Sequence, residues 1–240
     1  MTFRICWALT VINYYSHLDT RDSIIIPGEI ISSEISLREK LRHIKALLFD
    51  WDGIFNDGEK GHVPSTYNEI DSMGINMLRF GYYLLHGENP VTGIVTGEQN
   101  ETALQWAERE HLHAVYLKAK NKADILESFQ LEYGIKSSEI LFVFDDIHDL
   151  SLAKKAGCRI LVPNKGASMF SRYCREHKIC DYISKNPGGS YALREISEVI
   201  LGLLGLFTQT IEHRAEFSEI YSDYFQMRNL VKTIIQEMKY

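Results

Sequence analysis

The feature that most constrains the fold is a short apolar run, residues 46–49, that ends in two aspartates one residue apart, Asp50 and Asp52. A continuous apolar run of this length is typical of a buried strand in a parallel sheet, and such sheets place their chemistry at the carboxyl ends of the strands. Two carboxylates held together there are costly unless a cation or a proton transfer uses them. The stretch therefore predicts a strand end with a chemical role.

The rest of the chain alternates between helical and strand patterns. After this first strand, helical spacing of apolar residues alternates with apolar runs, the helices being expected at 72–86, 100–110, 122–133, 149–156 and 190–204, and the strands at 91–97, 114–117, 140–144, 159–163 and 180–184. This order predicts right-handed βαβ units and an α/β, Rossmann-like fold with a parallel sheet flanked by helices. Turn formers at 57–64 predict a small β-hairpin flap, and no large cap domain is expected.

Three segments are expected along the chain. Residues 1–34 show no clear period and form an N-terminal extension of uncertain order, and residues 35–205 carry the repeating α/β pattern. Residues 206–240 show apolar residues at helical spacing and predict an amphipathic helical extension. This extension either packs on its own domain or contacts another subunit, and we favour the subunit contact by a small margin.

Composition excludes several classes of function. The chain is 45% hydrophobic and 24% charged with a net charge of -6, so neither nucleic acid nor an anionic membrane surface is an expected partner. No apolar stretch approaches the roughly 20 residues that a membrane-spanning helix needs. The four cysteines lack paired spacing, which indicates a reduced, cytoplasmic protein. A semi-apolar run at 5–15 resembles a signal peptide, but Asn13 interrupts it, so secretion is a minor alternative.

Polar residues follow several of the predicted strands and can converge at one edge of the sheet. They are the Asp50/Asp52 pair, Thr96-Gly97, Lys122, and the cluster Asp145, Asp146 and Asp149. Clustered aspartate oxygens suit Mg²⁺. Thr96 and backbone amides suit a phosphoryl group, and Lys122 would balance its charge. Singly, each feature is more simply a helix cap, a turn or a solvated lysine; their combination and order favour a phosphoryl-transfer site.

These residues stand in motifs that resemble the haloacid dehalogenase (HAD) superfamily of phosphatases. The stretch Asp50-Trp51-Asp52-Gly53-Ile54-Phe55-Asn56-Asp57-Gly58 resembles its DxDGxxTDG signature. The segments 67–75, 94–97, 121–122, 145–149 and 188–195 resemble further motifs, in the same order, over residues 36–204. The closest resemblance is to the capless branch that includes 3-deoxy-D-manno-octulosonate 8-phosphate phosphatases.

The resemblance implies an activity and a set of roles. It implies a Mg²⁺-dependent phosphatase acting on a small phosphorylated metabolite, plausibly a sugar phosphate, in which Asp50 is the nucleophile and Asp52 the general acid and base. Thr96 and Lys122 complete the implied catalytic set. The implied metal ligands are Asp50, the Asp52 backbone carbonyl and Asp145, with Asp146 or Asp149 acting through water. The implied substrate-binding residues are Asn56, Asp71, Gly97 and Arg194. Capless relatives use neighbouring subunits to close the site, so a homo-oligomer, a tetramer, is expected.

The chain also departs from the family pattern. Ile70, Glu98 and Ser190 stand where related enzymes carry arginines that engage the substrate, Asn56 replaces a threonine, and Phe144 replaces a glycine. Losing these arginines removes anion-binding capacity. A second hypothesis is therefore a catalytically weak or inactive scaffold that kept the fold. A receiver-like phospho-acceptor switch is a third, which the DxDG order fits poorly.

Overall fold

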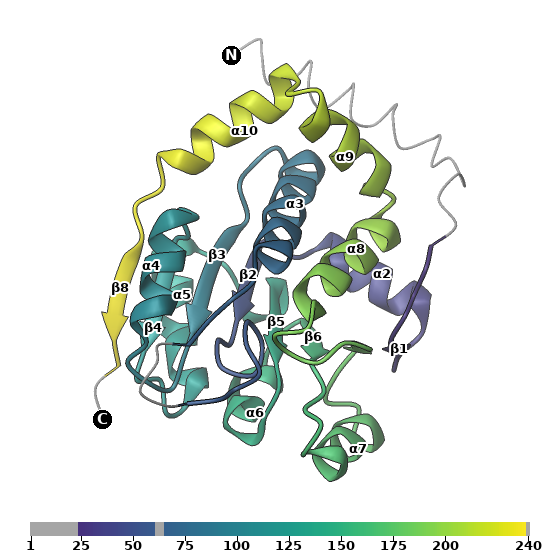
Figure 1. The fold of residues 1–240 in the computed structure, drawn as a ribbon, viewed down its shortest axis with the longest axis vertical. Helices are drawn as coiled ribbons and strands as arrows, with labels where there is room; N and C mark the ends of the chain where they lie inside the picture. The colour runs from purple at the N-terminus through teal and green to yellow at the C-terminus, as the bar shows by residue number, and fades with distance from the viewer. Residues whose placement is uncertain (1–23, 61–64, 239–240) are drawn as a thin grey trace.

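The computed structural model describes residues 24–60 and 65–238, and these contain an eight-stranded sheet (Figure 1). The strand order is β1-β7-β6-β5-β2-β3-β4-β8. All neighbours pair in parallel except β1 and β7. The strands are β1 (Glu29–Ile30), β2 (Ala46–Phe49), β3 (Val91–Val95), β4 (Ala114–Leu117), β5 (Ile140–Phe144), β6 (Cys158–Leu161), β7 (Tyr182–Ile183) and β8 (Ile234–Glu237).

Helices cover both faces of this sheet. Leu47 and Phe49 of β2 pack with α2, α3, α4 and α8, whereas Ala46 and Leu48 pack with α5, α6 and α7. This split follows from the alternation of side chains along a strand. The helices are α2 (Glu34–Arg42), α3 (Glu69–His86), α4 (Glu101–Arg109), α5 (Ile125–Tyr133), α6 (Leu150–Ala153), α7 (Ser168–Glu176), α8 (Ala192–Leu204), α9 (Phe207–Ala215) and α10 (Glu219–Asn229).

The α/β fold class predicted from the sequence is confirmed. The ranges expected for β4 and β5 match the observed strands, and the range 122–133 is filled by a 3-10 turn, Lys122–Asp124, followed by α5. The expected hairpin flap is not present in the described part of that loop, because 57–60 and 65–68 contain no strand; residues 61–64 lie outside the described residues. No helix in the described parts of the chain has both the length and the apolar character that a bilayer crossing requires.

The C-terminal segment differs from its prediction. Helices α9 and α10 end at Asn229, and 234–237 form β8, which pairs with β4 at the edge of the sheet (Figure 1). A helix over 206–240 is therefore wrong beyond residue 229, because Val231, Thr233, Ile234 and Ile235 are β-branched and favour a strand. The segment packs on its own domain, with α9 against α3 and α8 and α10 against α3. Of the expected N-terminal extension, 1–23 lie outside the described residues, and 29–30 form β1.

A buried carboxylate, Asp181, ties α2 to the sheet. The Asp181 side chain accepts hydrogen bonds from the Arg159 backbone N–H (2.9 Å) and guanidinium (2.9 and 3.0 Å) and from Lys40 Nζ (2.7 Å). Burial would raise the pKa of Asp181, but Arg159 and Lys40 outweigh it, and the pKa lies below the usual 3.8.

We predict that Asp181→Ala lowers the free energy of unfolding by about 2 kcal/mol, less than a fully buried pair would lose because Lys40 and Arg159 can rehydrate. The folded-state pKa of Asp181 is depressed, so its contribution is complete well above pH 3.8 and is lost as the pH falls below that value. Urea titrations at pH 7 and at acid pH measure both effects. Glu176→Gln, which breaks the exposed Arg172–Glu176 pair, is the control and should change little.

Candidate active site

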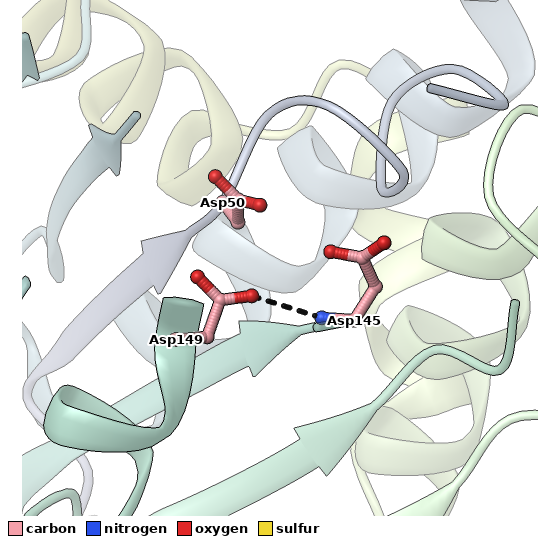
Figure 2. A group of neighbouring side chains, drawn as sticks. All are labelled: Asp50, Asp145 and Asp149. Carbon is pink, nitrogen blue, oxygen red and sulfur yellow. Dashed lines mark hydrogen bonds between the residues drawn. The ribbon is translucent and has the colours of Figure 1, made fainter. Parts of the chain in front are cut away.

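Three aspartates meet at the carboxyl ends of neighbouring strands. Asp50 follows β2 and Asp145 follows β5, and these strands are paired, with Phe49 beside Val143. Asp149 closes a 3-10 turn, Ile147–Asp149, directly after β5. Figure 2 shows the three carboxylates facing one space, and their nearest oxygens all lie within 4.8 Å of one another. All three residues are buried, with at most 8% of each exposed.

Lys122 supplies the positive charge next to this cluster. It begins the 3-10 turn after β4, is 2% exposed, and places Nζ 2.5 Å from one oxygen of Asp50 and 2.5 Å from one oxygen of Asp149. The other oxygen of Asp149 accepts hydrogen bonds from the backbone N–H groups of Asp145 and Asp146, both at 3.2 Å. One ammonium group therefore faces three buried carboxylates, which leaves negative charge uncompensated.

The pKa values of the aspartates reflect this imbalance. Burial, assisted by the nearby Asp149, raises the pKa of Asp50 to about 7, although Lys122 opposes the rise. Burial, with Asp50 and Asp149, raises the pKa of Asp145 to about 9. Burial alone would lower the pKa of Lys122, but Asp50 and Asp149 reverse this and raise it. The cluster thus resists full ionisation by itself. Its all-carboxylate donor set suits a hard divalent cation, which would offset the excess charge.

Asp52 stands apart from the three clustered carboxylates. Its Oδ2 pairs with Lys60 Nζ at 3.1 Å, while its Oδ1 is buried and has no hydrogen-bond partner among the described residues. An unpartnered buried carboxylate oxygen is costly, which is a mark of a group kept for a reaction. The predicted role of Asp52 in proton transfer and the predicted metal ligation by its backbone carbonyl both stay predictions.

The loop after Asp52 is packed against the cluster through glycines. Gly53 has φ +82°, and a Cβ at this position would lie 2.0 Å from Asp145 Oδ2. On its other side a Cβ at Gly188 would lie 1.9 Å from the Gly53 carbonyl oxygen. Asn56 holds the loop by accepting hydrogen bonds from the N–H groups of Gly53 (3.3 Å) and Gly58 (2.8 Å). Residues 53–58 therefore have little freedom beside the carboxylates.

Thr96 and Gly97 follow β3, on the other side of β2. Thr96 is 1% exposed; its N–H donates to the Tyr116 carbonyl (2.9 Å) and its hydroxyl accepts from the Glu98 N–H (3.4 Å). A Cβ at Gly97 would meet no atom within 4 Å, so the backbone there borders open space. This arrangement leaves room for a ligand beside the strand end.

Several residues expected to bind substrate or metal have structural partners among the described residues. Asp71 is fully buried and accepts from the backbone N–H of Arg194 (2.8 Å) and from Asn68 (2.7 Å), which ties the start of α3 to the start of α8. The Arg194 guanidinium pairs with Glu198 at 2.6 Å. Asp146 is exposed and caps the Ile147 N–H. Their proposed contacts with substrate or metal stay predictions.

Two lysines near the strand ends were missed by sequence reasoning. Lys60 pairs with Asp52, and Lys120 pairs at 3.0 Å with Glu98, the residue that replaces a family arginine. No sequence signal could have found them, because both lie in loops and their partners are set by the fold. The departure at Glu98 is thus accompanied by a neighbouring cation.

Comparisons with known proteins agree with this geometry. No family model matches the chain. The 3-deoxy-D-manno-octulosonate 8-phosphate phosphatase KdsC of Escherichia coli K12 is 23% identical over 167 residues, which are 68% of this chain and 81% of that protein. A HAD superfamily (subfamily III A) hydrolase from Legionella pneumophila superposes with a TM-score of 0.63 at 23% identity, covering 76% of this chain and 96% of that one.

A second similar structure was solved with ligands bound. The 3-deoxy-D-manno-octulosonate 8-phosphate phosphatase of Moraxella catarrhalis, solved with magnesium, phosphate and KDO, superposes with a TM-score of 0.60 at 26% identity, covering 76% of this chain and 98% of that one. This chain has the HAD fold. The resemblance read from its motifs is confirmed at that level, and the relatives it resembles are phosphatases.

We predict that Gly53→Ala disrupts the carboxylate cluster, because its Cβ would displace Asp145 and its φ would be strained. Adding MgCl₂ should raise the melting temperature of the wild-type protein, and this increase should be lost in the variant. Gly134→Ala is the matched control, since Gly134 also has a positive φ (+68°) but a Cβ there meets nothing within 4 Å. An equal magnesium response in Gly53→Ala would contradict the close approach.

Proposed function

We propose that the chain is a Mg²⁺-dependent phosphatase that hydrolyses a small phosphorylated metabolite through an aspartyl-phosphate at Asp50. The observation that supports the proposal is the meeting of Asp50 with Lys122 and with two further buried carboxylates at the strand ends. Asp50, Asp145 and Asp149 would hold the cation. When bound, Mg²⁺ would shield the anionic nucleophile from the anionic substrate and stabilise charge on the transferring phosphoryl group.

The first step is an in-line displacement. One carboxylate oxygen of Asp50 forms a bond to phosphorus as the bond between phosphorus and the ester oxygen breaks. Asp52 in its protonated form gives its proton to the leaving oxygen, so the alcohol departs neutral. Lys122, fixed between Asp50 and Asp149, orients the nucleophile and balances charge. Thr96 and the backbone at Gly97 would bind the phosphoryl oxygens.

The second step returns the enzyme to its starting state. Asp52, now ionised, takes a proton from water, and the resulting hydroxide oxygen forms a bond to phosphorus. The bond between phosphorus and the Asp50 oxygen breaks, and inorganic phosphate leaves. The partnerless Oδ1 of Asp52 supports this assignment, because it is free to accept a proton without giving up another contact.

The substrate class follows from the relatives and from the departures together. Relatives named as 3-deoxy-D-manno-octulosonate 8-phosphate phosphatases support a sugar phosphate. Ile70, Glu98 and Ser190 are exposed and supply no cation where related enzymes carry arginine. A substrate with fewer negative groups than an acidic octulosonate or nonulosonate phosphate therefore suits the site better.

We predict that Asp50→Asn lowers the rate of p-nitrophenyl phosphate hydrolysis in MgCl₂ by more than about a thousandfold, as loss of a nucleophile does elsewhere. Steady-state assays measure the loss, and circular dichroism verifies the fold. Asp57→Asn is the matched control, because Asp57 is exposed and caps only the Glu59 N–H in the same loop. Turnover that is unchanged in Asp50→Asn would contradict the nucleophile assignment.

The scaffold hypothesis is the second candidate, and the loss of the arginines favours it. Phosphate release from a panel of phosphorylated sugars, measured with the wild-type protein in MgCl₂, distinguishes the phosphatase hypothesis from the scaffold hypothesis. Release of phosphate from one or a few members supports the phosphatase. Flat results across the panel, from folded protein whose melting temperature rises with MgCl₂, would support a scaffold.

We further propose a homo-oligomer, a tetramer by analogy with the capless branch, because nothing in the described loop at 51–60 and 65–68 is large enough to cover the strand ends. Sedimentation velocity should give a particle of about four chains. A species of one 27.7 kDa chain at all concentrations would contradict this prediction.

A further inference from the structure

A cleft of about 330 Å³ lies between α3 and the C-terminal helices, apart from the carboxylate cluster. Its walls are the first half of α3, the end of α4, and α9 and α10. None of the residues assigned to the phosphatase site lines it, and α9 and α10 lie outside the range 36–204 that resembles the family motifs. A volume of this size is within the range of small-molecule sites.

The cleft carries an excess of positive charge. Arg109, Arg214 and Arg228 line it, together with the carboxylates of Glu69 and Glu110. Behind it lies Arg79, which is 1% exposed and donates to the backbone carbonyls of Glu110 (2.7 Å) and His111 (3.0 Å). Three lining guanidinium groups and Arg79 make four cations against two carboxylates. In a chain of net charge -6, this local excess is the reverse of the overall balance.

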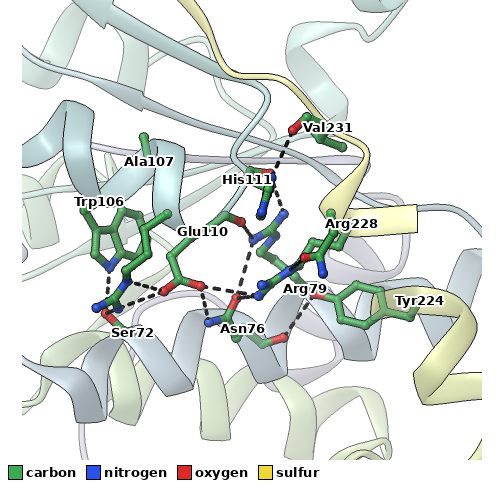
Figure 3. A network of polar contacts seen from close by, with 12 residues as sticks. Ser72, Asn76, Arg79, Trp106, Ala107, Glu110, His111, Tyr224, Arg228 and Val231 are labelled. Carbon is green, nitrogen blue, oxygen red and sulfur yellow. Dashed lines mark hydrogen bonds and ion pairs between the residues drawn. The ribbon is translucent and has the colours of Figure 1, made fainter. Parts of the chain in front are cut away.

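The two carboxylates are already fully used. Glu110 receives Asn76 (2.7 Å) and Arg228 (3.3 Å), which Figure 3 labels, and it also receives Arg109 (2.7 Å). Glu69 pairs with Arg109 at 2.6 Å. Neither can neutralise a further cation, so the excess charge is left for another anion.

Among the three arginines that line the cleft, Arg214 is the one with no acidic partner among the described residues. Its guanidinium carbon lies 4.6 Å from the ring centre of Phe217 and 4.9 Å from that of Tyr221, and it makes no ion pair with any described residue. The two rings, whose planes are nearly perpendicular (84°), hold the guanidinium between them, and it makes no hydrogen bond to the described residues. A planar, weakly hydrated guanidinium held this way is suited to bidentate contact with a carboxylate or a phosphoryl group.

The remaining lining is apolar and partly open. Met73 and Phe225 are 40% and 38% exposed, and Phe80 and Tyr221 lie behind them. Large apolar side chains that remain exposed around a cleft are typical of a ligand-binding site. They would contact a flat apolar group attached to the anion.

We propose that this cleft binds a small organic anion, a carboxylate or phosphoryl group carried on a flat apolar ring, with Arg214 as the main anion contact. The site is independent of the phosphatase site, so either could fail without the other. The probes are benzoate and phenylphosphonate. Phenylphosphonate has no phosphate ester bond, so a phosphatase cannot hydrolyse it. Benzamide, which has the ring without the charge, is the neutral control.

Isothermal titration of the full-length protein with each probe tests the proposal. At least one anion should bind, benzamide should bind less, and Arg214→Gln should weaken anion binding about tenfold, the effect of losing one charged contact. The probe that binds more tightly distinguishes a phosphoryl from a carboxylate ligand. Arg172→Gln, on the exposed face of α7, is the matched control and should bind as the wild type does.

Two further results would overturn the proposal. One is the absence of binding by both anions up to about 10 mM, a concentration beyond which affinity is negligible. The other is binding that survives Arg214→Gln but is lost in Lys122→Met, since the phosphatase site would then be the binding site. Arg214 makes no ion pair within the described chain, so its replacement removes only its contacts with Phe217 and Tyr221 and should leave the protein folded, which a thermal melt verifies.

Discussion

The cost of burying three carboxylates beside one ammonium group governs the arrangement of this molecule. Asp50, Asp145 and Asp149 are each less than a tenth exposed, and within the described part of the chain Lys122 is the cation that pairs with this cluster. Burial raises the pKa of Asp50 and Asp145, which measures how poorly the site tolerates its own charge. The parallel sheet makes the cluster possible, because neighbouring strands bring their carboxyl ends to one edge. The same excess of negative charge favours the binding of a divalent cation, and an anionic phosphoryl group would be repelled until such a cation offsets it.

The loops around the cluster serve to keep this geometry rigid. Trp51, between Asp50 and Asp52, is fully buried and stacks on Phe55 with ring centres 4.3 Å apart. Trp106 packs at their side, and its ring N–H donates to Ser72 of α3 at 2.7 Å. Anchoring Trp51 in the core fixes the backbone on both sides of it. The aspartates before and after it are thereby held without a cap domain.

Much of the fold and the centre of the site could be predicted from the sequence, and the failures have physical causes. The ranges of β4 and β5 are apolar runs bounded by polar residues, so they were predicted to the residue. Helix α7 was missed because it spans only nine residues; its apolar residues, Met169, Phe170, Tyr173 and Cys174, do recur at helical spacing, but over too few turns to stand out in the sequence. Residues 234–237 were taken for helix because Ile234 and Ile235 extend the spacing of the preceding helix. Pairing with β4, a contact 120 residues away (Ala114 to Ile234), decides their structure.

In the site, too, the features set by the order of the strands could be predicted from the sequence, whereas those set by side-chain orientation could not. The rule that parallel strands end at one edge of a sheet predicted that Asp50, Asp145 and Lys122 meet. These residues lie far apart in the chain, but each follows a strand of the same sheet. The rule could not separate Asp146 from Asp149, because the two differ only in which way a 3-10 turn points them; the turn directs Asp149 inward to Lys122 and leaves Asp146 exposed. The substrate-binding roles predicted for Asn56 and Asp71 stay predictions, and in the structure each side chain accepts a hydrogen bond from a backbone N–H group. Motif residues beside a reactive centre can be required for its shape, so position in a motif alone does not decide whether a side chain meets the substrate.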